Sequence, residues 1–142
     1  MTVKVNAFET GLFAFCANNN VKARRWVGVA RAQVFEVCAP ENLLVYVKDS
    51  ALTIGWWGIA FTVYQRLAGS SQDWRLALLV REGEEGYLLS GTQIKGMVSA
   101  LSTNATEYIL HEADATAGWH FTTFEALYKR LLTQAYAVSG SN

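Results

Sequence analysis

The chain is organised around the stretch ALTIGWWGIAFTVYQRL, which runs from Ala51 to Leu67. This stretch is uncharged from Ser50 to Gln65 and places two adjacent tryptophans, Trp56 and Trp57, between two glycines. Sixteen uncharged residues are fewer than the roughly 20 that a helix needs to cross a bilayer. We therefore expect no membrane span here and consider a buried strand or a buried helix.

The composition of the central stretch favours a strand. Most of its residues are β-branched or aromatic, which are the types that fit a pleated surface. Gly55 and Gly58 would each destabilise a helix by about 1 kcal/mol, but inside a strand they permit a bulge or a bend. The spacing of Trp56, Ile59 and Val63 also fits one face of a helix. We predict one long, bent, central strand over 51–67, with a helix as the alternative.

Length and composition indicate one globular domain over residues 1–142. The chain is 51% hydrophobic and 17% charged, which is too apolar for a disordered protein. Twelve basic residues balance twelve acidic ones, but the first 81 residues carry most of the basic residues and the rest of the chain carries most of the acidic ones. Such asymmetry indicates either a basic binding surface or complementary faces that meet in an oligomer.

The two cysteines are predicted to be buried free thiols. Cys16 and Cys38 stand in apolar surroundings, with no CxxC spacing and no neighbouring histidine. The N-terminal sequence has no secretory signal pattern. We therefore expect a cytoplasmic protein.

The first half of the chain is interpreted as strands joined by turns. Alternating residues predict a strand over Thr2–Phe8, and the asparagines at 18–20 suit a tight hairpin. The hairpin would lead into a returning strand over Val21–Val37, for which a helix is the alternative. Pro40 predicts a turn. The next strand, Leu43–Lys48, is expected to pair with the central stretch.

The second half combines strands with two helices. Strands are expected over Trp74–Val80, Tyr87–Leu89 and Glu107–Glu112, with an acidic turn between the first two. A short helix is predicted by helical spacing that begins at Ile94, with Ser90 or Thr92 as its cap. The last helix is predicted to begin with a capping box formed by Thr122 and Glu125. Its expected buried stripe consists of Phe124, Leu127, Tyr128, Leu131 and Ala135.

These elements predict an α+β fold. We expect a mostly antiparallel, strongly bent sheet of six or seven strands, covered by the two helices of the C-terminal third. Runs that are apolar on both faces, 12–17 and 76–80, indicate that part of the sheet is buried twice. A dimer would achieve this by placing Trp56, Trp57 or Trp26 at a shared interface. Alternatively, a closed barrel would enclose a pocket for a small apolar ligand.

No stretch of the sequence matches a catalytic, metal-binding or nucleotide-binding motif. His111 and His120 lack the i, i+4 spacing that places two imidazoles on one helix face for zinc. We therefore predict no catalytic residue, no metal site and no cofactor. The absence of such a constellation favours a protein that is not an enzyme.

One segment, 22–31, combines cations with an aromatic ring. Basic residues beside an aromatic side chain can bind phosphates while a base stacks on the ring. The residues concerned are Lys22, Arg24, Arg25, Trp26 and Arg31. They could bind single-stranded nucleic acid or an acidic protein partner.

The sequence leads us to expect a non-enzymatic binding or regulatory module that acts through protein–protein contacts, including contacts with itself. The first alternative is a single-stranded nucleic-acid-binding module that uses segment 22–31. The second is a carrier of small apolar ligands built as a closed barrel. The sequence does not indicate which protein the partner is.

Overall fold

The computed structural model describes residues 2–39, 41–50 and 54–140, so the turn expected at Pro40 lies outside them. Within these residues the chain forms two sheets and five α-helices. The larger sheet has the strand order β1-β2-β3-β5-β6-β9. Its strands are β1 (Lys22–Arg25), β2 (Val34–Cys38), β3 (Asn42–Asp49), β5 (Asp73–Leu79), β6 (Gly86–Ser90) and β9 (Trp119–Phe121).

The smaller sheet has the order β4-β8-β7. Its strands are β4 (Trp56–Ala60), β7 (Ser102–Thr103) and β8 (Glu107–His111). The helices are α1 (Val3–Asn18), α2 (Phe61–Gly69), α3 (Gly91–Met97), α4 (Glu112–Ala115) and α5 (Phe124–Gly140), and a 3-10 turn, η1 (Val98–Ala100), follows α3.

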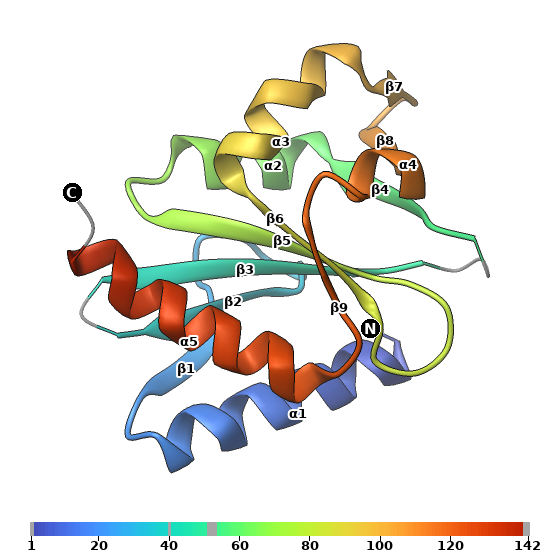
Figure 1. Ribbon diagram of the computed structural model, residues 1–142. Helices are drawn as coiled ribbons and strands as arrows, with labels where there is room; N and C mark the ends of the chain where they lie inside the picture. Colours follow the sequence, from blue (N-terminus) through green and yellow to red (C-terminus); the bar gives the residue numbers. More distant parts are fainter. Residues whose placement is uncertain (1, 40, 51–53, 141–142) are drawn as a thin grey trace.

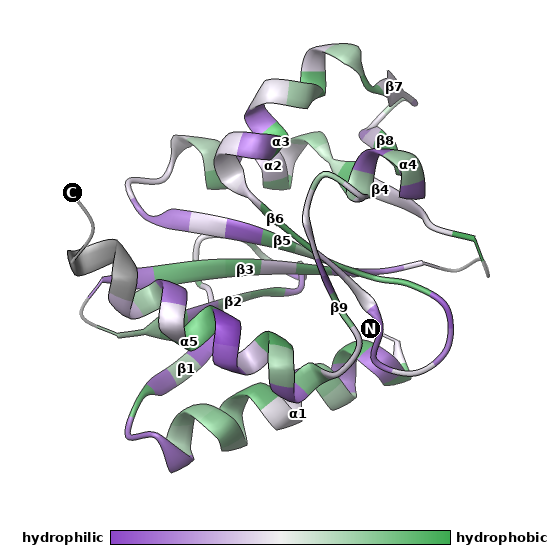
Figure 2. Ribbon diagram, in the orientation of Figure 1, coloured by the Kyte–Doolittle hydropathy of each residue, from purple (hydrophilic) through white to green (hydrophobic). Residues whose placement is uncertain are grey.

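The larger sheet is covered on both faces (Figure 1). Helices α1 and α5 lie on one face, while α2, α3, α4 and the smaller sheet lie on the other. Hydrophobic residues follow the middle of the sheet between these layers (Figure 2). The chain therefore has two cores, one on each side of a central sheet.

Strand β3 supplies both cores because successive side chains of a strand point to opposite faces. Leu43 and Val45 contribute to the core under α1 and α5, and Leu44 and Tyr46 contribute to the other core. All four side chains are buried. The expectation that part of the sheet is buried twice is therefore met within a single chain.

The first segment was expected as a strand over Thr2–Phe8, but it forms α1. The side chain of Thr2 caps this helix by accepting a hydrogen bond from the Val5 amide at 3.1 Å. The alternating pattern ends at Ala7, whereas buried residues continue at helical spacing to the end of α1. That buried face consists of Val5, Phe8, Leu12 and Cys16.

The segment Val21–Val37 was expected as one strand, with a helix as the alternative, but the chain forms a hairpin of β1 and β2 there. Its loop, 26–33, is closed at the base by a hydrogen bond from the Trp26 amide to the Val34 carbonyl at 2.9 Å. The preceding turn has the left-handed backbone expected of asparagine, because Asn20 has φ of 59°. This turn follows helix α1, where a strand was expected from the sequence.

The prediction of one long strand over 51–67 is wrong. Residues 51–53 lie outside the described residues, and the remainder forms β4 followed directly by α2. Strand β4 pairs with β8, and β3 pairs with β5 in parallel. The expected pairing of Leu43–Lys48 with the central stretch is therefore also wrong. A parallel pair needs a long crossover, which β4 and α2 provide.

The later elements agree better with the sequence. Strands β5 and β6 pair antiparallel across the acidic turn, and the Ser90 hydroxyl accepts from the Gln93 amide at 3.1 Å to cap α3. All five residues of the predicted α5 stripe are buried. The capping oxygen of α5 belongs to Thr123, which accepts from the Ala126 amide at 3.1 Å, one residue beyond the expected cap.

The overall prediction of an α+β fold with a mostly antiparallel sheet is confirmed, with one parallel pair. The expected cover of two C-terminal helices is incomplete, because α1, α2, α4 and the smaller sheet also cover the larger sheet. The larger sheet is open, with β1 and β9 at its edges. The closed barrel is therefore wrong, and with it the carrier that depended on an enclosed pocket.

Candidate functional site

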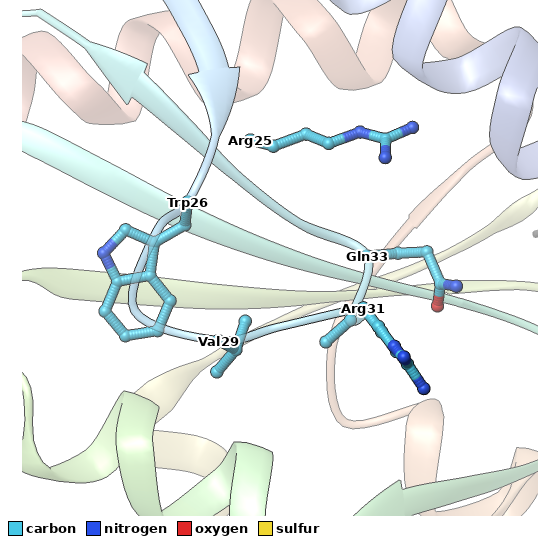
Figure 3. A pocket seen from close by; sticks show the side chains of 6 residues that line it. Arg25, Trp26, Val29, Arg31 and Gln33 are labelled. Carbon is cyan, nitrogen blue, oxygen red and sulfur yellow. The ribbon is translucent and has the colours of Figure 1, made fainter.

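The hairpin loop 26–33 lines two hollows, and Figure 3 shows the first of them. The first hollow has a volume of about 270 Å³. Its lining residues are Arg25, Trp26, Val29, Arg31, Ala32 and Gln33. In Figure 3, Arg25, Arg31 and Gln33 extend to one side of the loop and Trp26 lies on the other. Cationic side chains and an aromatic ring thus bound the same space.

The second hollow adjoins the first and has a volume of about 390 Å³. It is lined by Thr2, Val5, Gln33, Lys48 and Asp49. Gln33 lines both hollows, so we treat them as one site and call it the loop groove. Three parts of the chain meet there: the start of α1, the hairpin loop and the end of β3.

Gly28 gives the loop its shape. A Cβ atom at this position would overlap the indole ring of Trp26, so only glycine lets the loop fold against that ring. Trp26 is half-buried and packs against the core that α2 and β4 share. The ring is thereby held at the edge of the groove.

Arg31 occupies the loop in an unfavourable backbone conformation. Its φ of 65° lies in the left-handed region, which costs a non-glycine residue about 1 kcal/mol or more. Its side chain is exposed, and no ion pair within the described part of the chain involves it. A strained, exposed and unpaired cation at the groove is a candidate ligand contact.

Two ion pairs border the groove. Arg25 donates to both oxygens of Glu9 on α1, from Nε at 2.6 Å and from Nη2 at 2.8 Å. The hydrogen bond with Glu9 raises the pKa of Arg25. At the other end, Lys4 Nζ lies 3.5 Å from Asp49 Oδ1, an oxygen that accepts no hydrogen bond from the described residues.

The structure divides the predicted basic segment between the groove and other surroundings. Arg25, Trp26 and Arg31 reach the groove, whereas Lys22 and Arg24 do not line it. Lys22 is exposed at the start of β1, opposite Cys38. The structure therefore brings together three of the five residues that the sequence singled out.

Arg24 contacts a buried carboxylate instead. Its Nε donates to Glu36 Oε1 at 2.7 Å, and Asn42 and Gln72 donate to Glu36 Oε2, each at 2.7 Å. Glu36 is only 3% exposed. Burial acts to raise the pKa of Glu36, but the hydrogen bonds from Arg24, Gln72 and Asn42 outweigh it, so the pKa is lowered. This cluster joins β1, β2, β3 and the loop before β5.

Sequence reasoning missed the groove residues that lie outside segment 22–31. Gln33 follows that segment directly, while Lys48 and Asp49 end β3 and Thr2 precedes α1. Lys48 and Asp49 are a polar pair at the end of an otherwise buried strand. That pattern could have indicated from the sequence that they belong to a site. No local signal places the start of α1 beside them.

The two central tryptophans have different surroundings. Trp57 is 1% exposed and its indole nitrogen donates to the Leu79 carbonyl at 3.0 Å. It is buried within its own chain and so is not available as a subunit interface. Trp56 is 36% exposed and pairs with His111 across β4 and β8. Self-association through Trp56 or Trp26 stays a prediction.

Other polar groups lie away from the groove. His120 contacts Glu85 at 2.8 Å, and His111 lies 4.0 Å from Asp114. Within residues 2–39, 41–50 and 54–140, no three His, Cys, Asp or Glu side chains are grouped to hold a metal ion. Burial raises the pKa of Cys16 to about 11, as suits an unreactive thiol. In the same residues, no helix has the length and apolar character to cross a bilayer.

Comparison with known proteins reveals a match in fold. No family model and no curated protein sequence matches the chain. Among solved structures, it is similar to Hjc, a Holliday junction resolvase from the archaeal hyperthermophile Archaeoglobus fulgidus. The TM-score is 0.55 at 14% identity, over 83% of this chain and 92% of the resolvase. At this identity the likeness shows the fold alone.

This match corrects the function expected from the sequence. The prediction of a non-enzymatic module acting through protein–protein contacts is wrong on this comparison, because the solved structure of similar fold is named a Holliday junction resolvase and not a binding module. The alternative expected from the sequence, a single-stranded nucleic-acid-binding module that uses segment 22–31, agrees better with this comparison.

Proposed function

We propose that this chain acts on DNA and that the loop groove holds the sugar–phosphate backbone of one strand. The observation that carries the proposal is the convergence of Arg25, Arg31 and Lys48 on adjoining hollows. They come from β1, the hairpin loop and β3. Cations gathered in this way neutralise phosphates and release their counterions, which supplies most sequence-independent affinity for DNA.

Each groove residue has a distinct role in this proposal. Arg31, which has no carboxylate partner among the described residues, contacts a phosphate directly, and Lys48 contacts the next one as a point charge. Arg25 has a planar fork that suits bidentate contact with a phosphate when the phosphate displaces Glu9 from it. Trp26 is half-buried at the rim, and the exposed part of its ring can contact an unpaired base.

The structural match supports DNA as the nucleic acid. The protein of similar fold is named a Holliday junction resolvase, and a Holliday junction is DNA in which four strands exchange partners. We therefore expect this chain to prefer DNA with branched or unpaired regions over a fully paired linear duplex.

Gel retardation at low salt tests the proposal. A labelled four-way junction, a linear duplex and a single strand of the same sequence would each be titrated with the chain. We expect the junction and the single strand to be retarded, with affinity falling steeply as salt rises. Replacing either Arg31 or Lys48 by Ala should weaken binding to all sequences alike. Lys95→Ala, on α3 and outside the groove, is the matched control and should bind normally.

Absence of retardation for all three substrates would refute the proposal. Equal weakening by Lys95→Ala would also count against the groove, because binding would then follow net charge alone. Incubating the same mixtures with Mg²⁺ and resolving them on a denaturing gel detects strand cleavage, which would extend the action on DNA from binding to catalysis.

A further inference from the structure

A third hollow lies between the hairpin loop and α2. Its volume is about 160 Å³. Its lining residues are Gly28, Val29 and Ala30 from the loop and Thr62, Val63 and Arg66 from α2. Loop and helix are separated by about 30 residues of sequence, so only the folded chain forms this space.

The third hollow shares one lining residue with the loop groove. Val29 lines both the third hollow and the hollow that Arg25 and Arg31 border. Hollows therefore lie along the loop from the end of β3 to the surface of α2. Arg66 therefore lies in a hollow that Val29 borders from the loop.

Arg66 is suited to receive such a ligand. Residues four apart lie on the same face of a helix, so Thr62 and Arg66 both face the loop, as their shared lining of the hollow requires. Arg66 is exposed, and no ion pair within the described residues uses it. Its guanidinium charge is thus balanced by no carboxylate of the described chain.

We infer that the hollow between the loop and α2 is a second phosphate-contact site, in which Arg66 binds the backbone of the strand that the loop groove holds. This inference rests on the proposed function. The two sites together would follow one strand around the loop, so a strand must exceed a minimum length to reach both. The Thr62 hydroxyl can donate a further hydrogen bond to the same phosphate.

Strand length separates the second site from the first. Single-strand binding sites span roughly 4 to 16 nucleotides, so we choose labelled DNA oligonucleotides of about 4 and about 16 nucleotides and measure binding by fluorescence anisotropy at low salt. Wild-type chain, Arg66→Ala and Arg66→Lys would be compared, with Lys95→Ala as the control for lost charge. Thermal unfolding of each variant verifies that it is folded.

We expect Arg66→Ala to weaken binding of the long strand several-fold and to leave the short strand unaffected. The slope of log affinity against log salt for the long strand should fall by about 0.7, the value of one phosphate contact on single-stranded nucleic acid. Arg66→Lys should keep most of that slope, and Lys95→Ala should change neither strand.

Two results would overturn the inference. One is unchanged affinity and salt slope of Arg66→Ala on the long strand. The other is equal weakening on both strands, which would place Arg66 in the first site or in the support of the loop. If the wild-type chain binds neither strand, the proposed function itself fails, so the two failures are distinguishable.

Discussion

Arg25 and Glu9 are joined by two parallel hydrogen bonds, which tie the start of the hairpin loop to α1. The pair satisfies the same fork of donors that a phosphate would use. Any phosphate that binds Arg25 must therefore compete with the Glu9 carboxylate. The ion pair both positions the arginine and limits its availability.

Replacing Glu9 by Gln should strengthen DNA binding. The substitution removes the competing negative charge and leaves Arg25 free to contact phosphate, so we expect a several-fold gain in affinity at low salt that shrinks as salt rises. Anisotropy titrations of a labelled strand measure it. Glu125→Gln is the matched control, since its carboxylate is exposed on α5 and pairs with Lys129 at 3.6 Å. An equal gain in both variants would show a net-charge effect and no competition at Arg25.

Replacing Arg31 by Gly should change stability and binding in opposite directions. Glycine accepts the φ of 65° at this position without strain, so the free energy of unfolding should rise by about 1 kcal/mol or less. The lost cation should at the same time weaken binding to DNA. Denaturant unfolding and anisotropy measure the two effects.

Asn20→Gly is the matched control for Arg31→Gly. Asn20 also has left-handed backbone, with φ of 59°, but it does not line the groove. It should stabilise the chain to a similar or smaller extent without affecting DNA binding. Unimpaired binding by Arg31→Gly would exclude this arginine from the site.

The Glu36 cluster predicts a component of acid sensitivity. Because its pKa is lowered in the folded chain, Glu36 stabilises the fold fully above the ordinary value of 4.5, and this contribution is lost as the pH falls through the folded value. Glu36→Gln should lower the free energy of unfolding near neutral pH by roughly 1 to 3 kcal/mol. The difference in free energy of unfolding between wild type and Glu36→Gln should become smaller below pH 4.5.

Melting temperatures between neutral pH and acid measure this effect. Glu85 and Glu112, whose pKa values are lowered to about 2 chiefly by hydrogen bonds from Arg81, titrate alike in both proteins. The difference between wild type and Glu36→Gln therefore isolates Glu36. A difference that is constant over the whole range would mean that Glu36 contributes through shape and not through charge.

The two central tryptophans should differ in their contribution to stability. Trp57→Ala removes a fully buried ring and its hydrogen bond to Leu79, so we expect a loss of about 3 to 5 kcal/mol. Trp56→Ala should cost much less, because its ring is partly in solvent. Chemical denaturation measures both. Similar losses would show that Trp56 is covered in solution, and sedimentation would then reveal whether a second copy covers it.

The fold could be predicted from the sequence where a hydrophobic or turn pattern is local and fits only one type of secondary structure. The stripe that ends at Ala135 needed only helical spacing, and the acidic turn needed only two flanking strands. The segment 51–67 failed because β4 and α2 follow one another without a break in hydrophobicity. In α1, packing at Phe8 and Leu12 prevailed over the low helix propensity of the valines near its start.

The candidate site could be predicted only in part for the same reason. Arg25, Trp26 and Arg31 lie within one short segment, so their composition was sufficient. Lys48 depends on the position of β3 beside the loop, and Arg66 depends on a helix that the sequence pattern concealed. Long-range packing, which no local pattern encodes, completes the site.

Strand β1 forms one open edge of the larger sheet, and its sequence KARR carries a positive charge at three of four positions. Unpaired edges invite copies of a protein to join their sheets, and charged side chains oppose that joining. The arginines that we assign to binding and to the Glu36 cluster therefore also protect the chain against aggregation. Replacing several of these cations by neutral residues should therefore lower the solubility of the chain. Variants of β1 that are meant to test binding should keep the charge, for example by changing arginine to lysine.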